Sequence, residues 1–193
     1  MRKILTAMAM LAAGVLVDVW AGPAFAHTGV SATTGLAQGF LHPLGGVDHV
    51  LAMVAVGLYA AQLGGRGLWL LPSAFVVTMV VGGLAGYAGV ALPMVEPVIG
   101  VSVVAMGALI ALGVRLPNLA AMALVAAFAL AHGHAHGGEG AELASFLTYA
   151  AGFVAATALL HGAGIAVGLT LDRLAPLPAT VIRRAAGVAG ALA

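Results

Sequence analysis

The chain has 193 residues, of which 63% are hydrophobic and only 7% are charged. Soluble domains are charged at about a quarter of their positions, so this chain lacks the side chains for a water-facing surface and is expected in a lipid bilayer. A net charge of +1 provides no basic surface for nucleic acid. Cysteine is absent and Lys3 is the only lysine, which excludes disulfides, thiolate metal sites and a P-loop in the rest of the chain.

Residues 1–26 predict a cleavable signal peptide. Two basic residues precede an apolar run, and the small side chains of Ala24 and Ala26 suit signal peptidase. A retained first helix is the alternative. Cleavage after Ala26 would leave residues 27–193 as one transmembrane domain.

Five apolar stretches of about membrane-spanning length follow, separated by short breaks that contain Gly, Pro or charged residues. We therefore predict an all-α fold, a polytopic membrane helix bundle with five full transmembrane helices. A short or truncated sixth helix is expected over 176–193, where only nine residues follow Arg184. The five long stretches cover residues 44–63, 68–90, 95–114, 118–136 and 143–171.

The basic residues predict how this array is oriented. Cytoplasmic loops of membrane proteins are enriched in Lys and Arg. With the mature N-terminus in the periplasm, every arginine after the signal peptide falls in a cytoplasmic segment, which predicts a multi-pass protein of the bacterial inner membrane. These arginines are Arg66, Arg115, Arg173, Arg183 and Arg184.

Glycines at small-xxx-small spacing predict close helix packing in lipid. We interpret them as contacts within the chain, and a homo-oligomer through the same helix faces is the alternative. The pairs are Gly35 and Gly39, Gly82 and Gly86, and Gly164 and Gly168.

Ionisable groups at membrane depth are expensive and usually line a pathway or cavity. Two clusters stand out near the predicted outer face, one over residues 42–49 and one over residues 132–139. Glu96 lies at the outer start of the third stretch, whereas His161 lies deeper, within the fifth.

The second cluster has the spacing of a helical metal site. On a continuous helix His132 and His136 lie one turn apart and Glu139 falls on the same stripe, while His134 points elsewhere. Two histidines at i and i+4 can hold one metal ion. A solvated polar helix end is the alternative.

The first cluster depends on how the chain bends. In an unbroken helix His42 and His49 would lie about 10 Å apart along the axis, too far to share an ion. Pro43 is predicted in the first helical turn, so that His42 can fold over from the cap. Asp48 can bind a metal directly or orient a histidine. A capped helix start with a buried Asp–His pair is the alternative.

Four other residues are further candidates. Glu96 is either a ligand or a helix cap, and His161 is either a packed histidine or a relay site on a path inward. After processing, His27 would offer an α-amine and an imidazole as a chelating pair. His134 lies off the stripe of the second cluster.

The two clusters resemble motifs of the HupE/UreJ family of nickel and cobalt permeases. The family's first motif is H-P-x-x-G-x-D-H, and its second resembles F-H-G-x-A-H-G-x-E. Ala131 stands in place of the aromatic residue of the second motif, and the resemblance spans nearly the whole chain. The matching residues are His42, Pro43, Gly46, Asp48 and His49, then His132, Gly133, Ala135, His136, Gly137 and Glu139.

The resemblance implies a permease domain over 27–193 that takes up Ni²⁺, or Co²⁺, by secondary transport and is not an enzyme. No prosthetic group is implied, and hydrogenase or urease maturation is the indirect link. Imidazole and carboxylate ligands suit nickel, which is compatible with this reading. The implied metal ligands are His42, Asp48, His49, His132, His136 and Glu139, with His27, Glu96, His134 and His161 as the further candidates.

Two other functions compete with transport. A membrane-embedded zinc-dependent hydrolase could use His132, His136 and Asp48 to activate water. No H-E-x-x-H motif is present, however, and Ser102 lacks the following glycine of a rhomboid-like nucleophile. A metal-binding membrane subunit that transports nothing is the third possibility, and the inward position of His161 argues against it.

Overall fold

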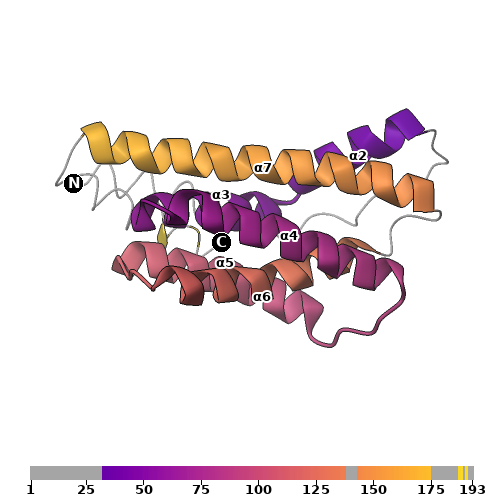
Figure 1. The fold of residues 1–193 in the computed structure, drawn as a ribbon, viewed down its shortest axis with the longest axis horizontal. Helices are drawn as coiled ribbons and strands as arrows, with labels where there is room; N and C mark the ends of the chain where they lie inside the picture. Colours follow the sequence, from indigo (N-terminus) through magenta and orange to yellow (C-terminus); the bar gives the residue numbers. More distant parts are fainter. Residues whose placement is uncertain (1–31, 138–142, 175–186, 189, 191–193) are drawn as a thin grey trace.

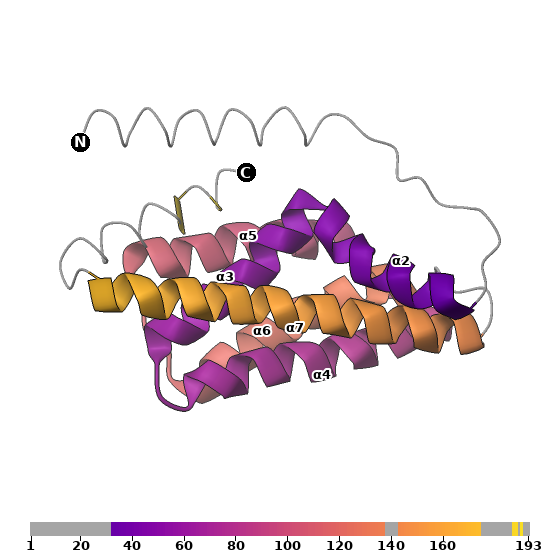
Figure 2. The same cartoon turned by 90° about the horizontal axis from the view of Figure 1, so that it is seen from above.

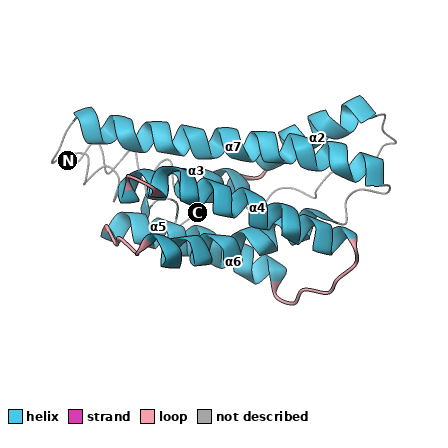
Figure 3. Cartoon of the chain, in the orientation of Figure 1, coloured by secondary structure: helices cyan, strands magenta, loops and turns pink. Residues whose placement is uncertain are grey.

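The computed structural model describes residues 32–137, 143–174, 187–188 and 190 of the chain. Within these residues the fold is all-helical and contains no strand (Figure 3). The predicted signal peptide and the arginines at 183 and 184 lie outside the described residues. The helices are α2 (Ala32–Gly45), α3 (Val47–Leu63), α4 (Gly67–Tyr87), α5 (Val95–Leu112), α6 (Asn118–Gly137) and α7 (Leu143–Leu174).

Four of the predicted stretches form single helices close to their expected bounds, namely α4, α5, α6 and α7. Their ends coincide with the breaks read from the sequence. Gly113, for example, ends α5 in the left-handed conformation with φ of 68°, which a residue without a Cβ adopts at little cost.

The first stretch, predicted over 44–63, forms α3 from Val47 onward, and the sequence did not predict the helix α2 that precedes it. The two helices meet at an angle of 82° at Gly46. Pro43 lies in the last turn of α2 and not in the first turn of a helix. Its missing N–H and the poor helix propensity of Gly45 and Gly46 explain why the helix stops here.

The long helix α7 lies against both halves of this bent pair (Figures 1 and 2). Its 32 residues give a length of about 48 Å, more than the thickness of a bilayer core. Gly39 of α2 packs against the backbone of Tyr149, and Gly57 of α3 packs against the backbones of His161 and Gly164. These glycines let the helix backbones approach closely, as expected in lipid.

Helices α4 and α6 form the most extensive helix pair of the bundle. Gly82 and Gly86 of α4 face the backbone of α6, and Gly133 and Gly137 of α6 face the backbone of α4. A side chain at any of these four positions would meet backbone atoms of the other helix. The small-residue faces of α4 are therefore used within the chain, and an oligomer would need other faces.

Helices α4, α5, α6 and α7 are each long and apolar enough to cross a membrane, and α2 with α3 makes a fifth span if the bent pair is counted as one. Large apolar side chains point outward from the bundle, including Trp69, Leu112 and Leu159, each more than half exposed. A soluble monomer rarely leaves so much apolar surface in water. The chain is thus a multi-pass membrane protein.

One end of the bundle gathers the α3–α4 and α5–α6 connections and the last turn of α7 (Figure 1). The Gln62 side-chain amide donates to the Val114 carbonyl at 2.9 Å, and the Leu116 N–H donates to the Tyr59 hydroxyl at 3.2 Å. Arg66, Arg115 and Arg173 all belong to this end.

Candidate metal site

Three imidazoles from three helices converge where α2 meets α3. His42 comes from the end of α2, His49 from the first turn of α3 and His136 from the last turn of α6. One ligand nitrogen of each lies within 4.8 Å of the others. We refer to these residues as the histidine triad.

The geometry of the histidine triad is close to that of a metal site. The Nε2 atoms of His49 and His136 are 2.7 Å apart. At metal–nitrogen bonds of about 2.05 Å, tetrahedral ligands are separated by about 3.3 Å, so a modest outward movement of the rings would admit an ion. The ring centroids of His42 and His136 are 4.3 Å apart, and that of His49 is 4.8 Å from that of His136.

The bend at Gly46 accounts for this convergence. An unbroken helix would hold His42 and His49 about 10 Å apart along its axis, whereas their ring centroids lie 6.0 Å apart in the bent pair. The sequence allowed bending at these glycines, and the structure shows that the two helices form a corner there.

Asp48 orients its neighbour. The Nδ1–H of His49 donates to the Asp48 carboxylate at 3.0 Å, because a carboxylate can only accept. A neutral His49 then has its lone pair on Nε2, the atom that faces His136. This is the carboxylate–histidine arrangement that supports metal binding, and Asp48 is not among the residues whose ligand atoms converge.

Aromatic rings of α7 form one wall of the histidine triad. Phe153 lies 5.8 Å from His42 and 5.3 Å from His136, measured between ring centroids, and Tyr149 lies 5.9 Å from His42. A low-polarity wall strengthens the interaction between an ion and its ligands.

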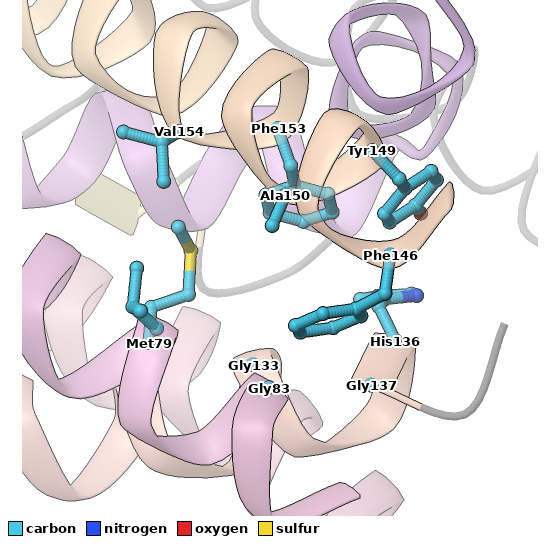
Figure 4. A pocket seen from close by; sticks show the side chains of 11 residues that line it. Met79, Gly83, Gly133, His136, Gly137, Phe146, Tyr149, Ala150, Phe153 and Val154 are labelled. Atoms are coloured by element: carbon cyan, nitrogen blue, oxygen red, sulfur yellow. The ribbon is translucent and has the colours of Figure 1, made fainter. Parts of the chain in front are cut away.

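A pocket between α4, α6 and α7 is lined in part by His136 (Figure 4). Its lining side chains are apolar apart from His136 and the Tyr149 hydroxyl, with Met79, Phe146 and Phe153 among them. Figure 4 shows His136 beside Phe146 at the edge of this pocket. The pocket therefore offers few metal ligands of its own, and the converging nitrogen atoms lie at the histidine triad.

His132 adjoins the histidine triad, with its ring centroid 5.4 Å from that of His49, but it is not among the residues whose ligand atoms converge. It is fully buried, and its Nε2 is 3.0 Å from the Ser102 hydroxyl oxygen. Ser102 donates its own proton to the Ile99 carbonyl at 2.7 Å, so Nε2–H of His132 must donate to Ser102. The lone pair of a neutral His132 is then on Nδ1, which has no hydrogen-bond partner among the described residues.

The remaining predicted residues fall in several places. His134 points away, as expected from the stripe, and its Nε2 lies 2.6 Å from the Val90 carbonyl. Glu96 is exposed in the first turn of α5, and its carboxylate is not part of the histidine triad. His161 is buried within α7. His27 and Glu139 lie outside the described residues.

Ser102 and Phe153 are neighbours of the site that the sequence motifs do not include. A lone hydroxyl in an apolar helix must find a buried partner, and this rule is the signal by which Ser102 can be identified from sequence. Phe153 gave no such signal, because one aromatic residue among many apolar ones does not reveal its contacts.

Comparison with known proteins points to one family. The sequence profile of the family described as HupE / UreJ protein matches residues 8–193. A curated relative, Protein HupE of Rhizobium leguminosarum bv. viciae, is 45% identical over 191 residues, which cover 99% of this chain and 94% of the relative. No solved structure matches the chain significantly. The similarity includes every described helix.

Proposed function

The chain belongs to the HupE/UreJ family, and on that basis we propose that it is a secondary permease for Ni²⁺, with Co²⁺ as the alternative ion, and not an enzyme. The observation that supports this most directly is the convergence of His42, His49 and His136 from three helices. Neutral imidazoles suit nickel and cobalt, and the chain has no thiolate for softer ions.

The arrangement of charges supports uptake from the periplasm across the bacterial inner membrane. The described arginines lie at the end of the bundle where α3 and α5 end and α4 and α6 begin, and such an end is usually cytoplasmic. The histidine triad is nearer the opposite end, since His136 is in the last turn of α6. An ion from the periplasm would then reach the triad first, and a link to hydrogenase or urease maturation would follow inside the cell.

Uptake of ⁶³Ni²⁺ by proteoliposomes that contain the purified protein tests this proposal. His49→Ala and His136→Ala should each reduce uptake to the level of empty liposomes, because each removes one of three converging nitrogens. His134→Ala is the matched control, since this histidine is on the same helix turn but bonds to Val90 instead. It should retain most of the wild-type rate.

Two results would overturn the proposal. Wild-type protein that binds Ni²⁺ but never moves it into the lumen would indicate a metal-binding subunit without transport. Full uptake by both the His49→Ala and His136→Ala variants would remove the histidine triad from the transport path.

A further inference from the structure

His161 is a buried imidazole with no visible bonding role. Its side chain is 1% exposed, and neither Nδ1 nor Nε2 has a hydrogen-bond partner among the described residues. Leaving a buried polar group unsatisfied lowers the stability of the fold, so buried nitrogens of this kind are rare in structural roles. An apolar residue would pack here more favourably, which suggests that the imidazole serves another purpose.

The backbone around His161 is held firmly. Gly57 of α3 lies directly against the His161 carbonyl oxygen, and Gly164 of α7 lies against the Val54 carbonyl oxygen of α3. The imidazole extends towards α4, where it meets Phe75 edge-on at 5.0 Å between ring centroids and 88° between ring planes. Phe75 is about 12 Å along α4 from its first residue, Gly67, so His161 is near the middle of the bundle.

A row of rings connects His161 to the histidine triad. His49 lies 5.4 Å from His132, His132 lies 5.9 Å from Phe75, and Phe75 lies 5.0 Å from His161, all between ring centroids. Phe75 thus stands between two buried histidines, each with a nitrogen that has no partner in the described part of the chain. The row begins at the outer site and leads towards the arginine end.

We propose that His161 is an inner binding position for a borderline divalent transition-metal ion, and that Nδ1 of His132 is a separate position on the way to it, with the ring of Phe75 as the apolar barrier between the two imidazoles. The role of this inner position in transport rests on the proposed function, whereas metal binding at His161 does not depend on it. Imidazole nitrogens in apolar surroundings select such ions over Mg²⁺ and Ca²⁺, which require oxygen ligands. Few protein ligands are available, so binding is weak enough to allow release inward.

Uptake combined with stability distinguishes a transport role from a packing role. His161→Leu should lower the initial rate of ⁶³Ni²⁺ uptake at least about tenfold, a typical loss when support for a metal site is removed. Its thermal midpoint should equal or exceed that of wild type, because an unsatisfied buried imidazole has been replaced by an apolar side chain. Gly162→Ala is the control on the same helix, since a Cβ there meets nothing within 4 Å.

A binding measurement tests the inner position without relying on transport. In detergent, a His42→Ala/His49→Ala/His136→Ala background removes the histidine triad, and titration with Co²⁺ followed by visible absorption should reveal residual imidazole-bound cobalt. Adding His161→Leu should abolish that signal, whereas adding His134→Ala should not.

The outcomes separate the two hypotheses. A signal that depends on His161 in a protein that takes up no Ni²⁺ would support the inner position and reject the transport function. A signal that is absent or unchanged by His161→Leu, or wild-type uptake by the His161→Leu variant, would overturn the inner position while leaving the outer site intact.

Discussion

At the scale of single residues, the site depends on which nitrogen of each imidazole holds the proton. Asp48 accepts the Nδ1–H of His49 and leaves Nε2 to face His136. Ser102 accepts the Nε2–H of His132 and leaves Nδ1 without a partner in the described residues. The bonds to Asp48 and Ser102 thus leave one lone pair on Nε2 of His49 and one on Nδ1 of the more deeply buried His132. An ion that bound Nε2 of His136 would have to displace the proton that this nitrogen donates to His49.

Ni²⁺ affinity should therefore depend on pH. A histidine must be neutral to bind a metal ion. Protons therefore compete with the ion for the nitrogens of the histidine triad, and Ni²⁺ affinity should decrease as the pH is lowered. Equilibrium binding of Ni²⁺ from pH 5 to 8 measures this.

The His134→Ala variant should show the same pH profile, because this residue is not in the histidine triad. Binding that stays constant from pH 5 to 8 would contradict histidine ligation. Initial uptake rates on the same preparation identify the energy source. Uptake that is unchanged when the proton gradient is collapsed would indicate passive movement of the ion.

At the scale of helices, the corner between α2 and α3 brings together His42 and His49, which an unbroken helix would hold apart. Gly46 is extended there, with φ of −103° and ψ of 121°, and its carbonyl accepts the first hydrogen bond of α3 from Val50. These angles are open to any residue, so conformation alone does not require glycine. Space does, because a Cβ at Gly46 would lie 2.8 Å from Oδ1 of Asp48 and 3.0 Å from Nδ1 of His49.

Gly46→Ala should consequently displace the Asp48–His49 pair and weaken Ni²⁺ binding by about 10- to 100-fold, the usual effect of disturbing a carboxylate that supports a histidine ligand. The fold should survive, because the backbone angles suit alanine. Isothermal titration with Ni²⁺ and circular dichroism on the same sample measure both quantities.

The adjacent Gly45→Ala substitution is the matched control. A Cβ at Gly45 meets nothing within 4 Å, so affinity should stay near the wild-type value. Equal loss of affinity in both variants would indicate that flexibility of the glycine pair matters and not the space beside Asp48.

At the scale of the whole molecule, the two ends of the bundle differ in chemistry. The three arginines in the described part of the chain are at the end formed by the α3–α4 and α5–α6 connections and the end of α7. The α4–α5 connection lies at the other end (Figure 1). The histidine triad is nearer the end that contains the α4–α5 connection, because His136 is in the last turn of α6. This polarity is what an importer needs if the arginine end faces the cytoplasm.

Single cysteines test the orientation, because the chain contains no cysteine of its own. Val90→Cys is on the α4–α5 connection and Pro117→Cys is on the α5–α6 connection, and both positions are exposed. In spheroplasts, a membrane-impermeant maleimide should label Val90→Cys from the periplasm and should label Pro117→Cys only after lysis. Labelling of both positions before lysis would reject the proposed orientation.

The sequence by itself determined the class of the protein and most of its helices. Apolar runs bounded by Gly, Pro and charge are local features, and in lipid a backbone must satisfy its hydrogen bonds within each helix. The bounds of α4 to α7 therefore followed from composition. The histidine spacing also placed the side chain of His134 on a different face of the helix from those of His132 and His136, since the direction of a side chain on one helix depends only on its position.

Only the tertiary structure decided which candidate residues meet. The sequence grouped His132 with His136 because they are one turn apart, but the structure brings His136 to His42 and His49 and pairs His132 with Ser102. These partners lie on other helices, and no local pattern encodes such contacts. The 82° corner at Gly46 was equally hidden, because glycine and proline permit a bend whereas packing of α2 and α3 against α7 fixes its angle.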